Sequence, residues 1–179
     1  MVSYSTKRTW KQHYEKTTPN KTRNRIRKEI QKITKTKEGV TTQFLQTSLN
    51  HLPNFIGVFS IDQILKLQLD LDDCFVVNLD FSTQPGSHWI AIKLSQDKCF
   101  VIDSLGGALS SNYFKSFISK LSNGRKVIYS PALQQLKSNL CGFYCLFFLL
   151  YLEFATFSNL CKSFTSNLPL NDNKLLDFF

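Results

Sequence analysis

LCGFYCLFFLLYL, residues 140–152, is the longest apolar run of the sequence. Its thirteen residues fall short of the roughly 20 that a membrane-spanning helix needs. Glu153 follows the run directly. The segment therefore predicts a helix that is buried on all sides within a globular core.

Segments of strand length precede this helix. DCFVVNL, residues 73–79, is apolar almost throughout and predicts a strand that is covered on both faces. HWIAIKL, residues 88–94, and CFVIDSLGG, residues 99–107, flank a short polar turn and predict a β-hairpin. NFIGVFS, residues 54–60, and RKVIYS, residues 125–130, predict two more strands.

Amphipathic helices are predicted around these strands. The apolar side chains of residues 41–52 recur at helical spacing. Ser60 and Gln63 resemble a capping box that opens a short helix. Residues 110–122 form another amphipathic segment with Gly124 as its expected C-cap, and its inner stripe consists of Phe114, Phe117, Ile118 and Leu121.

The positive charge is concentrated at the N-terminus. The chain of 179 residues has a formal net charge of +9. Residues 1–40 hold twelve of the 22 Lys and Arg and three of the 13 Asp and Glu, whereas all 16 Phe lie at or after Phe44. The sequence thus predicts a basic, flexible arm over residues 1–40 and a globular domain over residues 41–179. Within the arm, residues 22–35 carry isoleucines at helical spacing, but this stripe is too thin to fold alone.

The arm has the composition of a segment that binds nucleic acid through charge rather than through sequence. A solvated tail without a ligand is the alternative, and both interpretations stay open at this point. The candidate contacts to DNA are Lys7, Arg8, Arg23, Arg25, Arg27 and Lys28.

The cysteines and the N-terminus limit the cellular setting. Five cysteines are an odd number, and the polar N-terminus has no features of a signal peptide. Free thiols in a reducing compartment are therefore expected, and the protein is not expected to be secreted. No Cys-x-x-Cys pair or Cys/His spacing suggests zinc, so we expect no metal. Because the longest apolar run is too short to span a bilayer, we expect no membrane partner either.

His88 lies at the start of an expected strand. If the hairpin turn is centred near Ser95 and Gln96, His88 lies opposite Asp103 on the same face, with Cβ atoms roughly 5 Å apart. A slip of one or two residues would leave the two as near neighbours. The carboxylate is then expected to hold the Nδ1–H of the imidazole. The alternative is a histidine that is simply half-buried at a strand end.

Cys141 is expected at the N-terminus of the buried helix, where free N–H groups and the helix dipole favour thiolate over thiol. A nearby histidine would complete the ion pair of a strong nucleophile. From the preceding loop, the amide of Gln134 or Gln135 can point to the position of a tetrahedral oxyanion. Alone, Cys141 would be a small core residue. Combined with an imidazole, a carboxylate and an amide, it predicts a nucleophilic site.

At these residues the sequence resembles the adenain-type clan of cysteine proteases, which holds the adenovirus protease and the proteases that remove SUMO-like modifiers. In both branches the catalytic residues follow one another along the chain as a histidine, an aspartate or glutamate, a glutamine and a cysteine. The same order is found here in the segments HW, FVIDSLGG and QQLKSNLCGFYC. LPNFIGVFSIDQI and DCFVVNLDFSTQPGSHW are more similar to the adenovirus protease family. The resemblance covers roughly residues 44–157. It implies an α+β fold in which a central mixed sheet packs against the buried helix that carries the nucleophile.

The resemblance also implies the roles of single residues in a thiol endopeptidase that needs no cofactor for its chemistry. Cys141 would be the nucleophile, His88 the general base and acid, and Asp103 the group that orients the imidazole. Gln135 would line the oxyanion hole with the N–H of Cys141. Gln134 is the alternative, because the two branches place this glutamine at different distances from the cysteine.

The implied substrates are virion precursor proteins of a DNA virus, cut beside small residues such as glycine because the cleft of the relatives is narrow. Trp89 would shape this cleft or fill the core. The expected setting is the virion and the host nucleus, with a monomeric enzyme and with DNA on the arm as a candidate activator. No cysteine lies between Cys99 and Cys141, so the disulfide-bonded activating peptide of the adenovirus enzyme is not expected.

Two other functions stay open. DSLGG and QQLKSNLCG favour the branch that cleaves SUMO- or ubiquitin-like conjugates in the nucleus or cytoplasm. A protease-like fold without turnover would instead be a DNA-binding or scaffold protein, and the complete set of four residues argues against this third function.

Overall fold

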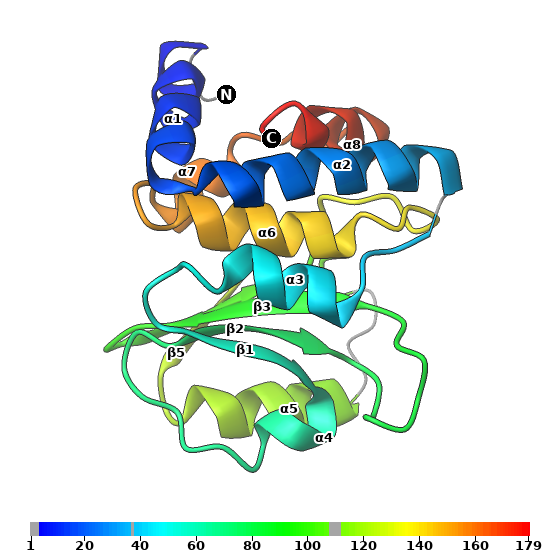
Figure 1. Ribbon diagram of the computed structural model, residues 1–179. Helices are drawn as coiled ribbons and strands as arrows, with labels where there is room; N and C mark the ends of the chain where they lie inside the picture. The colour runs from blue at the N-terminus through cyan, green and yellow to red at the C-terminus, as the bar shows by residue number, and fades with distance from the viewer. Residues whose placement is uncertain (1–3, 37, 108–111) are drawn as a thin grey trace.

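The apolar run of the sequence forms the central helix, α6, Cys141–Tyr151, and all eleven of its residues are buried. The computed structural model describes residues 4–36, 38–107 and 112–179. In it, α6 lies between a β-sheet on one side and the helices α2, Asn20–Thr36, and α8, Leu168–Leu176, on the other (Figure 1). The predicted buried helix is thereby confirmed.

Among the described residues, five strands form one mixed sheet in the order β1-β2-β3-β4-β5. The two outer pairs, β1–β2 and β4–β5, are parallel, whereas β2–β3 and β3–β4 are antiparallel. A mixed sheet that packs on a buried helix confirms the predicted α+β class. The strands are β1, Phe55–Ser60; β2, Cys74–Asn78; β3, Trp89–Leu94; β4, Lys98–Ile102; and β5, Lys126–Tyr129.

The hairpin of β3 and β4 is confirmed, but its register differs from the expected one. Leu94 pairs with Cys99, which moves the pairing along β4 by two residues. The cause lies in the turn, where the backbone N–H of Ser95 donates to the carbonyl of Lys98 at 2.9 Å. The Ser95 hydroxyl also accepts from the N–H of Lys98 at 3.2 Å. The turn therefore spans Ser95–Lys98 and is centred one residue later than expected.

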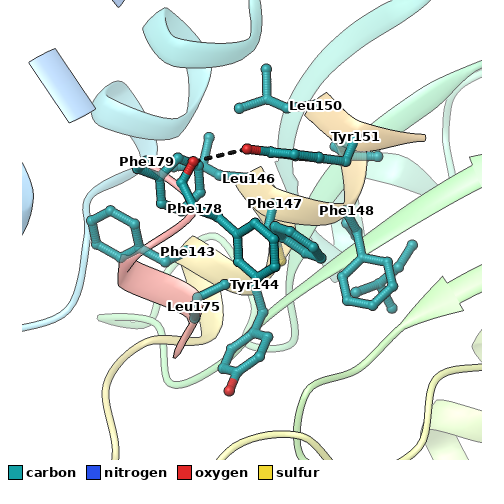
Figure 2. Close-up of a cluster of buried hydrophobic side chains, with 14 of the residues drawn as sticks. Phe143, Tyr144, Leu146, Phe147, Phe148, Leu150, Tyr151, Leu175, Phe178 and Phe179 are labelled. Carbon is teal, nitrogen blue, oxygen red and sulfur yellow. Dashed lines mark hydrogen bonds between the residues drawn. The ribbon is translucent and has the colours of Figure 1, made fainter. Parts of the chain in front are cut away.

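Aromatic side chains of α6 pack against one another and against Phe178 near the C-terminus (Figure 2). The rings of Phe147 and Tyr151 stack with centroids 4.7 Å apart, and the ring of Phe178 lies 4.6 Å from that of Phe147. The Tyr151 hydroxyl donates to the carbonyl of Phe178 at 2.8 Å, so this buried polar group has a partner. Cys141 is thus the first residue of a helix whose side chains are rigidly packed.

The opposite face of the sheet is covered by α4, Ile61–Ile64, and α5, Asn112–Ser122 (Figure 1). The predicted inner stripe of α5 is buried as expected. Gly124, at φ +79°, adopts the left-handed conformation of a C-cap. The predicted first residues of this helix, 110 and 111, lie outside the described residues.

The basic segment expected as a flexible arm forms two helices that pack on the globule: α1, Tyr4–Thr17, and α2. Tyr14 of α1 is 1% exposed and stacks on Tyr151 with ring centroids 5.6 Å apart. Ile26 and Ile33 of α2 are buried as well. Burial of each side chain contributes about 1.5–3 kcal/mol to the stability of the fold. The isoleucine stripe is too thin to fold alone, and it packs on elements that lie far along the chain. Because the sequence does not show this contact, the segment was expected to lie outside the core.

Together with α8, two further helices among the described residues lie around α6: α3, Thr42–Leu49, and α7, Phe157–Cys161. The predicted helix over residues 41–52 corresponds to α3. Thr41 caps it by accepting the N–H of Phe44 at 3.2 Å. The residues after Ser158 form most of α7 and all of α8.

Candidate active site

Three chain segments meet at one end of the sheet. His88 directly precedes β3, Asp103 directly follows β4, and Cys141 is the first residue of α6, which packs on β3. All three side chains are buried, with 3%, 1% and 8% of their residue surface exposed, respectively. The structure thus brings together the imidazole, the carboxylate and the thiol that were grouped from the sequence.

His88 and Asp103 form a buried ion pair, in which Nε2 of the imidazole lies 2.8 Å from Oδ1 of the carboxylate. The pair forms in spite of the shifted register because both residues lie just outside the paired parts of their strands. From the sequence, Nδ1 was expected to face Asp103, and this was wrong. The ring presents Nε2 to the carboxylate, which leaves Nδ1 for the side of Cys141.

The two partners determine the charge of His88. Burial alone would lower the pKa of the imidazole, but the hydrogen bonds with Asp103 and Cys141, and the charges on both, outweigh burial and raise the pKa of His88 to about 9. Burial acts to raise the pKa of Asp103, but the hydrogen bond and charge of His88 hold it below its ordinary value. At neutral pH the pair is therefore imidazolium and carboxylate.

The chain directly after Asp103 turns back onto its carboxylate. The backbone N–H of Leu105 donates to Oδ1 at 3.0 Å, and that of Gly107 donates to Oδ2 at 2.9 Å. Gly106 has φ +67°, and a Cβ there would overlap the backbone of Ala132. Glycine is therefore needed both for the left-handed turn and for the close approach of the next loop.

Cys141 begins α6, where backbone N–H groups and the positive end of the helix dipole favour an anion. The N-cap residue Leu140 has no side chain that can cap these groups. A negative sulfur is thus suited to this position. Cys145, one helical turn further on, is fully buried, and burial holds the pKa of its thiol well above the ordinary value. Cys145 is a packing residue of the core.

The two candidate glutamines point in different directions. Gln134 lines the same cleft as His88 and Cys141 and is 2% exposed. Its Oε1 accepts from the hydroxyl of Ser104 at 2.6 Å, and its Nε2 donates to the carbonyl of Ser138 at 2.6 Å. The amide of Gln135 instead contacts Asp172 of α8 at 3.4 Å, outside the cleft-lining residues. Of the two glutamines, only Gln134, the alternative left open by the sequence, lines the cleft together with Cys141.

Trp89 connects the site to the segment between α2 and α3. Its indole N–H donates to the carbonyl of Val40 at 3.2 Å. The side chain of Val40 packs onto Gly142, so that a Cβ at residue 142 would overlap it. Val40 therefore contacts the neighbours of both the imidazole and the thiol. This role was not expected from the sequence, because an isolated valine after a polar segment carries no signal of it.

An open cleft of about 850 Å³ leads to the thiol. One wall comes from the segment around Val40 and another from the loop before His88, which Asn78 holds by accepting the N–H of Ser87 at 3.4 Å. The exposed side chain of Leu136 lines the rim. Most of the lining is apolar or uncharged, and Asp80 is its one carboxylate among the described residues. The cleft thus suits an extended, largely uncharged segment of polypeptide.

The basic residues proposed to bind DNA differ in their surroundings. Arg25 donates to the carbonyl of Thr47 at 2.8 Å, and Arg27 donates to that of Phe179 at 3.2 Å. Arg23 donates to acceptors within α1 and α2. These three arginines thus help to fasten the helices, although Arg27, like Arg8 and Lys28, is exposed. The side chain of Lys7 lies outside the described part.

The part of the chain that the structure describes contains neither a metal-binding group nor a membrane-spanning helix. No group of three or more His, Cys, Asp and Glu side chains there is arranged to hold a metal ion. No helix in this part of the chain combines the length and the apolar character needed to cross a membrane. All five cysteines are free thiols, as expected.

No family model matches the sequence, and neither does any curated protein. Among solved structures, the chain is similar to the Se-Met ASFV pS273R protease, with a TM-score of 0.35 and 22% sequence identity. This alignment covers 59% of the present chain and 42% of the other. The chain thus spans less than half the length of that protease. Membership of the adenovirus protease family remains a prediction, and the functional conclusion depends on the geometry of the site.

Proposed function

We propose that the protein is a cysteine peptidase in which Cys141 is the nucleophile, His88 the general base and acid, and Asp103 the group that orients the imidazole. The observation that carries this proposal is the His88–Asp103 pair at 2.8 Å, with the Cys141 side chain as the other hydrogen-bond partner of the imidazole. A buried imidazolium between a carboxylate and a thiol at a helix N-terminus is the arrangement that activates sulfur.

The chemical step follows from these positions. The thiolate of Cys141 attacks a peptide carbonyl, and His88 gives its proton to the departing amine. Water then attacks the thioester, with His88 accepting its proton, and releases the acid. The amide of Gln134 and the N–H of Cys141 are proposed to stabilise the oxyanion of each tetrahedral intermediate. Gln134 replaces Gln135 in this role because only Gln134 lines the cleft.

The proposed substrates are precursor proteins of a DNA virus, cut within an extended segment beside small residues. The open cleft supports an endopeptidase, and the resemblance of residues 52–87 to the adenovirus enzymes supports the viral substrate class. In this proposal, DNA on the basic helices α1 and α2 is a candidate activator.

The second candidate is an isopeptidase that acts on SUMO- or ubiquitin-like conjugates. Two sequence features favour it: the aspartate at 103, where the adenovirus enzymes use a glutamate, and the following Ser-Leu-Gly-Gly. The catalytic chemistry would be the same, so only the substrate separates the two candidates.

The test is hydrolysis by the full-length protein of three substrates: a library of unstructured peptides, candidate capsid precursors and SUMO conjugates. We expect new N-termini from the peptides and precursors, and no product with Cys141→Ala. Release of SUMO alone would favour the second candidate. Equal products from wild type and Cys141→Ala would overturn both.

A further inference from the structure

The loop before α6, residues 133–138, is fastened from two opposite sides. On the first side, the carbonyl of Ser104 accepts the backbone N–H groups of Leu133 and Gln134 at 2.7 and 2.9 Å. The Ser104 hydroxyl donates to the side chain of Gln134. Because Ser104 directly follows Asp103, this side joins the loop to the strand end that holds the imidazole.

The second side is formed by α8, through two buried polar residues. Nδ2 of Asn171 donates to the carbonyl of Leu133 at 3.1 Å. The carboxylate of Asp172 accepts from the Gln135 amide at 3.4 Å, and the Ser138 hydroxyl is also its partner. These contacts flank Gln134 on both sides along the chain.

Tyr144 joins the same carboxylate to the nucleophile helix. Its hydroxyl lies 2.9 Å from both Oδ1 of Asp172 and the carbonyl of Leu133, so one proton serves two acceptors. Tyr144 is fully buried and lies one helical turn after Cys141 on α6. Asp172 is therefore connected both to the loop and to α6.

A buried carboxylate is costly for stability alone. Asp172 is only 7% exposed, and burial raises the pKa of its carboxyl group in spite of its hydrogen bonds with Tyr144, Ser138 and Gln135. An apolar side chain of similar size would fill this space at lower cost. What the carboxylate provides, and an apolar side chain cannot, is a set of directed bonds to the loop and to α6.

We propose that Asp172 is a positioning residue that fixes the loop of Gln134 relative to Cys141, so that the C-terminal helix α8 takes part in oxyanion stabilisation. This inference rests on the proposed peptidase function. Oxyanion donors act only when they are held close to the productive geometry. A carboxylate that binds both sides of the Gln134 position and the nucleophile helix supplies that restraint.

The test compares two reactions of Cys141 in a Cys161→Ser background, which removes the one thiol that is not buried. Alkylation by iodoacetamide needs the thiolate but no oxyanion hole. Binding of a peptide aldehyde that ends in glycinal forms a tetrahedral adduct. This reaction needs both the thiolate and the oxyanion hole. For Asp172→Asn we expect aldehyde binding and kcat to fall about tenfold or more, with KM and the alkylation rate close to wild type.

Three further variants complete the design. Gln134→Ala should show the same pattern, and Asp177→Asn, which removes an exposed carboxylate from the end of the same helix, should match wild type. Gln135→Ala removes a partner of Asp172 on the loop side, and a smaller fall in aldehyde binding is expected. It keeps the proposal testable if Asp172→Asn does not fold.

Each outcome has one meaning. If the wild type reacts with neither reagent, the proposed peptidase function fails. If Gln134→Ala weakens aldehyde binding but Asp172→Asn and Gln135→Ala do not, the positioning role fails while the peptidase stands. If Asp172→Asn lowers the alkylation rate and the aldehyde affinity equally, Asp172 has only a general structural role. This outcome would also overturn the proposal.

Discussion

The carboxylate of Asp103 contacts the imidazole of His88 at 2.8 Å and at the same time accepts the backbone N–H groups of Leu105 and Gly107. The donors of its own loop fix the direction in which the carboxylate points, and the carboxylate fixes the ring. This chain of contacts determines which ring nitrogen faces Cys141. The orientation of the base is thus decided within one short loop after β4.

The first prediction concerns Asp103→Asn. The amide keeps the shape of the side chain but loses the charge that stabilises the imidazolium. We expect kcat for peptide hydrolysis to fall by about 10²–10⁴. The measurement is steady-state hydrolysis of the best library peptide, and the control is Asp97→Asn, whose carboxylate is 71% exposed. A variant with activity near wild type would show that the carboxylate does not orient the base.

The second prediction concerns the stability of the pair as a function of pH. The folded pKa of His88, about 9, lies above the ordinary value of 6.5, so the folded state binds this proton more tightly than the unfolded chain does. The resulting stabilisation is fully present below pH 6.5 and is lost as the pH rises through about 9. Denaturant unfolding of wild type and His88→Gln should therefore give free energies that converge between these two pH values. Parallel curves across that range would contradict the raised pKa.

The third prediction concerns the packing of Val40 on Gly142. A methyl group on residue 142 would overlap Val40, and overpacking of this kind costs about 1–3 kcal/mol. Gly142→Ala should lower the free energy of unfolding by this amount. Because Val40→Ala removes the overlapping methyl, the double variant should recover most of that stability. Additive effects of the two substitutions in urea unfolding would show that the two residues do not meet.

The fourth prediction concerns DNA binding by α1 and α2. Deletion of these helices is an unsuitable test, because it would expose the surface of α6 that Tyr14 covers. We instead expect Arg8→Glu with Lys28→Glu to weaken DNA binding, and to lower the slope of its salt dependence by about one for each phosphate that is no longer neutralised. The matched control, Lys66→Glu with Lys120→Glu, makes the same change in net charge on the other side of the sheet. Equal weakening by both pairs would rule out a site on α1 and α2.

The elements whose signals are local could be predicted from the sequence. The run at 140–152 had to be a buried helix, and the hairpin brought His88 near Asp103 even with a register error of two residues. The ring nitrogen and the choice between Gln134 and Gln135 could not be predicted. They depend on where Ser104 and Asp172 lie, which is set by contacts between segments far apart in sequence. The same reason hid the packing of α1 and α2, whose apolar stripes look insufficient until α6 is present.

The most direct test of the nucleophile is a glycine-terminated peptide vinyl sulfone, followed by mass mapping of all five cysteines. We predict a single covalent adduct on Cys141 in the wild type, and its loss in His88→Ala, since an unassisted thiol at this position reacts slowly. An adduct spread over several cysteines, or one that forms on Cys141 equally fast without His88, would contradict the proposed nucleophile.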